Sequence, residues 1–152
     1  MNQTVTVNQE VREFSDYIEM QKAHQDDVDA FPMVFMFGQT TDEEIKTELA
    51  KIGARNLSEC ISVMGCGDMM RKADVPAWER LCSRHDEERK KFSESEDHLI
   101  EMIYCEMCNH EYGYTQNPED TLIALGKTIK AFEDETFFRA WQKAEARCLE
   151  CN

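Results

Sequence analysis

Hydrophobic residues recur at helical spacing throughout the second half of the chain. From residue 74 onward, apolar side chains return every three or four positions, which is the period of one face of an α-helix. This pattern predicts helices over 74–92, from 93 or 95 to about 111, and over 118–126. A last helix is predicted to contain Phe132, Phe137, Phe138 and Trp141.

The first half combines two helical patterns with short apolar runs. A helix is predicted over about 8–24, and the aspartates within 26–29 interrupt its pattern. A second helix is predicted to begin after Thr41, because Thr41 followed by Glu44 matches a capping box, and to end at Gly53.

Three short segments are predicted to be strands. The run 31–37 is apolar and aromatic and is typical of a buried strand, and 59–64 and 68–72 follow on either side of Gly65 and Gly67. The pattern therefore predicts an α+β fold. A small antiparallel sheet of about three short strands in the first half packs against five or so helices, and the second half is mainly helical. A single domain over residues 1–152 is expected, because the length suits one core and both halves carry the same net charge of −7.

Charge narrows the classes of partner. The chain has 17 Lys and Arg against 31 Asp and Glu, which gives a net charge of −14 and a pI near 4.6. So negative a chain is not expected to bind nucleic acid directly or to associate with anionic membranes, whereas a basic protein partner is favoured.

A cytoplasmic location is expected, because the N-terminal residues lack the pattern of a signal peptide and the longest apolar run is too short to span a bilayer. The seven cysteines are expected to be mostly reduced thiols.

The negative charge is concentrated in one segment. Residues 92–126 contain eight acids and no Lys or Arg. Neighbouring carboxylates on a helix face lie about 5–6 Å apart, a scale broadly similar to the phosphate spacing of a nucleic-acid strand, so such a face can imitate a polyanion. A solvated face that promotes solubility is the alternative. The candidate partner-binding acids are Glu94, Asp97, Glu101, Glu111, Glu119 and Asp120.

Two further clusters are candidates for a small-ligand site. Arg71 and Lys72 follow a glycine-rich turn and could bind phosphate, although pairing with internal carboxylates is the alternative. A second cluster stands where a predicted helix ends, and its histidine, carboxylate and tyrosines could bind or stack on a base, or simply pack over the end of the helix. Its members are His110, Glu111, Tyr112 and Tyr114.

Two Cys-x-x-Cys pairs are the candidate metal ligands. Four thiolates from Cys105, Cys108, Cys148 and Cys151 could form a tetrahedral zinc site. The first pair lies inside a predicted helix rather than on a tight turn, and the gap between the pairs exceeds the usual ribbon spacing. We therefore expect no metal and no cofactor, and expect the cysteines to serve as small buried side chains.

Several segments resemble a known family. They are the strand 31–37, the stretch 65–74 with its Arg71-Lys72-Ala73-Asp74, and 109–112 followed by 120–126. Over about residues 30–130 the chain resembles small acidic proteins of unknown function that are encoded by phages, prophages and mobile elements of Firmicutes. The resemblance implies no specific activity, but this setting favours inhibition of host defence systems.

These observations lead to a binding protein rather than an enzyme. The leading hypothesis is a phage-type anti-defence protein, such as an anti-CRISPR inhibitor, whose acidic surface blocks the basic nucleic-acid-binding site of a host nuclease. The alternative is a sponge for a nucleotide signal, or a small nucleotide-processing protein, that uses Arg71 and Lys72 with the 110–114 cluster. Assembly with further copies of the chain stays open.

Overall fold

The computed structural model describes residues 4–150, and the chain forms two compact units. Within the described residues, unit 1 comprises residues 4–11 and 22–86, and unit 2 comprises residues 12–21 and 87–150. The expectation of a single domain over residues 1–152 stays a prediction.

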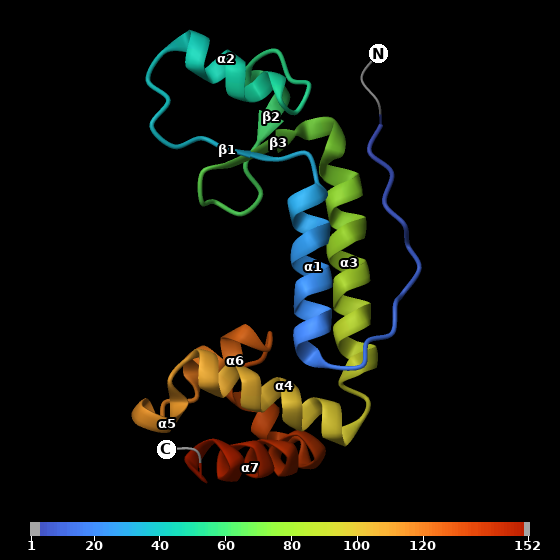
Figure 1. Cartoon of the computed structure of the whole chain (residues 1–152), viewed down its shortest axis with the longest axis vertical. Helices are drawn as coiled ribbons and strands as arrows, with labels where there is room; N and C mark the ends of the chain where they lie inside the picture. Colours follow the sequence, from blue (N-terminus) through green and yellow to red (C-terminus); the bar gives the residue numbers. More distant parts are fainter. Residues whose placement is uncertain (1–3, 151–152) are drawn as a thin grey trace. The chain divides into compact units, whose positions relative to one another are not determined.

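The predicted α+β fold is confirmed (Figure 1). Helices predominate and a three-stranded antiparallel sheet lies in the first half, as the hydrophobic pattern predicts. Within the described residues, no helix is both long enough and apolar enough to cross a membrane. The elements are α1 Tyr17–Ala30, β1 Val34–Phe35, α2 Asp42–Ala50, η1 Leu57–Glu59, β2 Cys60–Ile61, β3 Asp68–Arg71, η2 Lys72–Asp74, α3 Val75–Phe92, α4 Glu96–Asn109, α5 Tyr112–Thr115, α6 Glu119–Ala124, η3 Ile129–Glu133 and α7 Glu135–Glu150.

Unit 1 is built around the small sheet. The strands lie in the order β1-β3-β2, and both pairings are antiparallel. One face of the sheet packs its buried residues Val34 and Cys60 against Leu49 and Ile52 of the α2 region. Met70 points to the other face and joins a separate apolar cluster of unit 1. The capping box of α2 is confirmed, because the Thr41 hydroxyl accepts from the Glu44 N–H and the Glu44 carboxylate accepts from the Thr41 N–H.

Unit 2 is helical, and its main core lies between α4 and α7. Ile103 and Met107 of α4 are fully buried against Trp141 and Ala144 of α7. The first turn of α1 and the end of α3 contribute a second apolar cluster, in which Tyr17 and Phe92 pack with Met102.

The first predicted helix is displaced along the chain. α1 spans Tyr17–Ala30 rather than about 8–24, because the Asp16 carboxylate accepts from the Glu19 N–H (2.7 Å) and so caps the helix at a later residue. The aspartates within 26–29 do not end it. Asp26 pairs with Lys22, and Asp29 accepts from Gln25, at the i,i+4 spacing that stabilises a helix.

Other boundaries are shorter than the pattern predicts. β1 and β2 contain two residues each, so most of 31–37 and 59–64 is irregular or 3-10 structure, whereas β3 ends at Arg71, one residue short of the prediction. Phe132 lies in η3 rather than in the last helix, and α5 was not predicted.

Candidate functional site

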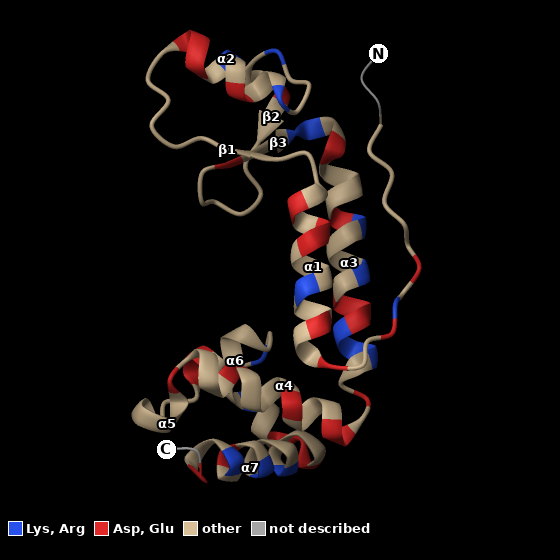
Figure 2. Cartoon of the chain, viewed as in Figure 1, with Lys and Arg blue, Asp and Glu red and all other residues tan. Residues whose placement is uncertain are grey.

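The predicted acidic surface is only partly available to a partner. Glu94 precedes α4 and Asp97 lies in its first turn, and both side chains are exposed. Figure 2 shows that acidic residues recur along α4 and in the chain just before it. Glu101 is half-buried, and its carboxylate accepts a hydrogen bond from the Tyr17 backbone N–H (3.0 Å). Glu101 therefore satisfies an N–H group in the first turn of α1, a role within unit 2.

The remaining predicted acids are exposed. Glu111 lies between α4 and α5 with a positive φ of 55°, and Glu119 and Asp120 stand in the first turn of α6. Together with Glu94 and Asp97 they give five exposed carboxylates from a segment without Lys or Arg.

Cations from α7 neutralise part of α4. Glu96 accepts from Lys143 (2.8 Å) and from Arg139 (3.2 Å), and these hydrogen bonds hold the pKa of Glu96 below its ordinary value. The negative charge of α4 is therefore strongest at the residues that α7 does not reach.

Glu106 is the buried acid of the segment. It is 5% exposed, and it accepts from the Tyr17 hydroxyl (2.7 Å) and from Gln21 (2.9 Å). Burial and this bond to Glu106 raise the pKa of Tyr17 well above its ordinary value. His110, a predicted ligand residue, lies 3.4 Å from the other Glu106 oxygen, one helical turn away.

The tyrosines of the predicted cluster have different surroundings. Tyr112 is buried against Trp141 and donates its hydroxyl to Glu145; burial and this hydrogen bond raise the pKa of Tyr112 to about 12. Tyr114 is 83% exposed. Tyr112 thus stabilises the packing of α5 on α7, and Tyr114 is the tyrosine here that a ligand can reach.

Arg71 is held by an internal carboxylate. Its side chain is buried, and Nε and Nη2 donate to the two oxygens of Asp74 at 2.9 Å each. Such a bidentate pair fixes the turn between β3 and α3. Lys72 is exposed. Both residues belong to unit 1, whereas His110, Tyr112 and Tyr114 belong to unit 2.

The cysteines of the predicted zinc site lie on two helices of unit 2. Cys105 is half-buried and Cys108 exposed on α4, Cys148 is buried on α7, and Cys151 lies outside the described residues. Burial raises the pKa of the Cys105 thiol, which favours the protonated form. Among residues 4–150, these thiols do not form a group of three with metal-ligand spacing.

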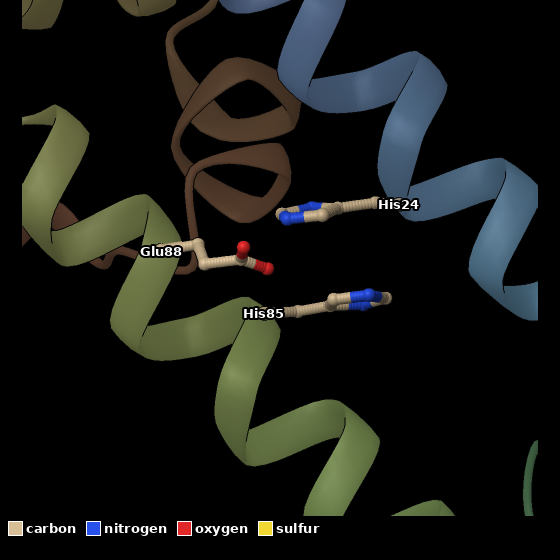
Figure 3. Close-up of side chains that lie close together, drawn as sticks. All are labelled: His24, His85 and Glu88. Carbon is tan, nitrogen blue, oxygen red and sulfur yellow. The ribbon is translucent and has the colours of Figure 1, made fainter. Parts of the chain in front are cut away.

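Two buried histidines that the sequence reasoning did not single out face each other in unit 1. The rings of His24 on α1 and His85 on α3 are stacked, with centroids 3.9 Å apart and planes 19° from parallel (Figure 3). His85 Nε2 lies 2.8 Å from the Asp27 carboxylate, which also accepts from Arg84. The spacing of His24 and Asp27, one helical turn apart, was the signal that could have indicated a shared face.

Glu88 stands one turn after His85 on α3, close to both histidines (Figure 3). Imidazole and carboxylate groups are ligands that zinc favours. The stacking opposes such use. A metal ion lies in the plane of each imidazole that binds it, and two nearly parallel rings hold their lone pairs in separate planes. Glu88 is also engaged by Arg12, whose Nε donates at 2.7 Å. As arranged, the histidine pair is a packing contact between α1 and α3.

An apolar patch on unit 1 is exposed. Phe35 and Phe37 are 44% and 68% exposed, and their rings stack in parallel with centroids 6.0 Å apart. The prediction of a buried strand over 31–37 is wrong for these two residues, because β1 alternates and only Val34 points to the core. We define the phenylalanine patch as Phe35, Phe37 and Ile61, all exposed.

A buried aspartate fixes the loop between β2 and β3. Asp68 is fully buried and accepts from the Ser62 hydroxyl and from the backbone N–H groups of Val63, Met64 and Cys66. Burial alone would raise the pKa of Asp68, but these hydrogen bonds outweigh it and lower the pKa to about 2. The loop is therefore preorganised around a carboxylate.

The fold and these surfaces define a small acidic α+β protein that presents both carboxylates and aromatic rings to solvent. The chain belongs to a family of unknown function, DUF7659, whose model matches residues 16–147. No curated protein and no solved structure matches the chain.

Proposed function

We propose that this protein is a binding protein whose acidic surface engages a basic partner. The observation that carries the proposal is the set of exposed carboxylates in unit 2 on a segment without Lys or Arg: Glu94, Asp97, Glu111, Glu119 and Asp120. A surface of this sign attracts a cationic groove over a Debye length of about 10 Å and orients the encounter.

The partner class that fits best is a protein that binds nucleic acid, because its basic groove is built for a series of anionic groups. We propose a nuclease of a host defence system, of the CRISPR type, which the protein inhibits by occupying the groove. Chemistry on a substrate is not needed for this function. Glu101 is left out of the contact surface, since its carboxylate is already engaged by the backbone of Tyr17.

The test is inhibition of DNA cleavage by a panel of purified CRISPR effector nucleases. One variant removes four exposed charges of unit 2 through Glu94→Gln, Asp97→Asn, Glu119→Gln and Asp120→Asn. A control removes four exposed charges of unit 1 through Glu10→Gln, Asp26→Asn, Asp29→Asn and Glu79→Gln, so both variants have the same net charge.

The chain should inhibit at least one nuclease, the unit 2 variant should need at least about tenfold more protein, and the control should match the unmodified chain. Absence of inhibition across the panel contradicts the proposed partner class. Equal loss in both variants means that total charge, rather than this surface, governs binding.

The nucleotide-binding alternative has less geometric support. Arg71 would have to exchange Asp74 for a phosphate, and Tyr112 is buried. A nucleotide that raised the melting temperature by a further increment with each tenfold rise in its concentration would favour this alternative.

A further inference from the structure

A groove in unit 1 joins an aromatic wall to an acidic one. It has a volume of about 570 Å³, and it is open to solvent along the first turns of α2. Phe37 forms one wall, and α2 provides Glu43, Thr47 and Glu48 on the other. This volume is within the range of about 300–1,000 Å³ typical of ligand pockets.

The carboxylates of the groove differ in how they are engaged. Glu44 is used by the capping box and by the Thr40 N–H (2.9 Å), and Glu48 pairs with the exposed Lys51 at 2.7 Å. The Glu43 carboxylate has no hydrogen bond or ion pair within residues 4–150, and it is exposed. An exposed pair such as Glu48–Lys51 contributes little and can be exchanged for a better one.

The groove also contains an amide that lacks a donor. The Oε1 atom of Gln39 is shielded from water, and it accepts no hydrogen bond from the part of the chain that the structure describes. A shielded acceptor without a donor costs free energy, which an N–H group from a ligand would recover after a small rotation of the side chain.

The aromatic wall is held in place rather than loosely attached. The Phe37 ring stacks on Phe35, and one side of the ring lies against Gly67, where an added Cβ would approach Phe37 Cε1 to 2.8 Å. The Met36 N–H donates to the Gly67 carbonyl at 2.7 Å, so the chain on both sides is fixed. Ile61 lies on the same sheet face as Phe35, because Phe35 pairs with Asp68 and Ile61 pairs with Met70, two residues further along β3.

We propose that this groove binds an arginine side chain from an extended segment of a basic protein, whose apolar neighbours rest on the phenylalanine patch. A guanidinium group can lie over the Phe37 ring and donate to Glu43 at the same time, and it also supplies the donors that Gln39 lacks. A second copy of this chain is a poor occupant, because its net charge of −14 repels the acidic wall.

This site goes beyond the acidic surface of unit 2, because it lies in unit 1 and combines aromatic and acidic contacts. Its failure would leave the proposed function untouched, and variants in one unit do not alter the residues of the other surface.

The test is a titration of the full ¹⁵N-labelled chain with the peptide acetyl-Val-Leu-Arg-Leu-Val-amide, followed by amide chemical shifts. The matched peptide carries citrulline in place of arginine, which keeps the shape and removes the charge. We expect saturable shifts confined to 35–48 and 61–67, and at least about tenfold weaker binding of the citrulline peptide.

Two variants locate the contact. Phe37→Ser and Glu43→Gln should each weaken binding at least about threefold, because each removes one wall of the groove. Their controls, Phe138→Ser and Glu133→Gln, change exposed residues of unit 2 and should bind as the unmodified chain does.

Three outcomes overturn the proposal: no saturable shift, equal binding of both peptides, or binding that Phe37→Ser leaves unchanged. Sedimentation that showed a dimer abolished by Phe37→Ser would also overturn it, since the occupant would then be a second copy.

Discussion

Asp68 is a fully buried carboxylate that accepts hydrogen bonds from Ser62, Val63, Met64 and Cys66. Its pKa of about 2 in the folded protein lies below its ordinary value of 3.8. The ionised form is therefore favoured by folding, and the stabilisation is fully present above about pH 4 and is lost as the pH falls towards 2. A depression of this size corresponds to about 2 kcal/mol.

We expect Asp68→Asn to lower the free energy of unfolding at pH 7 by about 2 kcal/mol, measured by urea denaturation. The variant should also lose less stability than the unmodified chain between pH 4 and pH 2. Asp26→Asn is the control, because Asp26 is exposed and forms a single surface pair with Lys22. A pH profile that is identical with and without Asp68 would show that other carboxylates carry the acid response.

Residue type alone does not reveal which carboxylates are available to a partner and which are used by hydrogen bonds within the chain. Glu101 and Asp97 belong to the same acidic helix, yet Glu101 accepts from the Tyr17 backbone while Asp97 faces solvent. The sequence predicted both as partner-binding residues, because helical spacing defines a face but not what packs against it. Contacts between residues 84 positions apart, as here, leave no local signal.

At the scale of elements, the sequence predicted the helix and strand boundaries that depend on residues close together in the chain. The capping box of Thr41 and Glu44 and the glycine-bounded strand β3 depend on residues a few positions apart, and both were predicted. The start of α1 and the exposure of Phe35 were not. α1 begins where Asp16 caps it and the Tyr17 hydroxyl donates to Glu106 of α4. β1 pairs with β3 through Val34 and Phe35 alone. The stacked pair of His24 and His85 likewise depends on two helices far apart in sequence.

The glycines of the loop before β3 have separable roles. Gly65 and Gly67 both have positive φ values, of 73° and 86°, but only at Gly67 does an added Cβ meet a neighbour, Phe37. Gly65→Ala should cost about 1 kcal/mol through its backbone conformation alone. Gly67→Ala should cost at least as much and should also displace the exposed Phe37 ring.

The measurement for these two variants is urea denaturation together with the aromatic proton resonances of Phe37. We expect the ring resonances to move in Gly67→Ala and to stay in place in Gly65→Ala. If both variants leave the ring resonances unchanged, Gly67 does not position the aromatic wall of the groove.

At the scale of the whole molecule, the chain has an excess of negative charge that internal ion pairs do not remove. At least eight of the 17 Lys and Arg residues form ion pairs with carboxylates, and those of Arg71 and Arg84 are largely buried. With 31 acids against 17 Lys and Arg, carboxylates outnumber the cations available to pair with them, and the excess carboxylates repel one another. Salt screens this exposed repulsion strongly and the buried pairs weakly.

Added salt should therefore stabilise the folded chain while it weakens binding to a basic partner. Raising NaCl from about 20 mM to about 300 mM shortens the Debye length from roughly 20 Å to roughly 6 Å, so we expect the melting temperature to rise by a few degrees. Sucrose at the same osmolality is the control for effects unrelated to charge.

Over the same range of NaCl concentration, inhibition of the nuclease should decline, because attraction across the interface is screened as well. A melting temperature that falls with salt would mean that exposed ion pairs such as Glu96 with Lys143 outweigh the repulsion. If the negative charge serves recognition, salt should raise the melting temperature and lower inhibition. If the charge only destabilises the fold, salt should raise the melting temperature and leave inhibition unchanged.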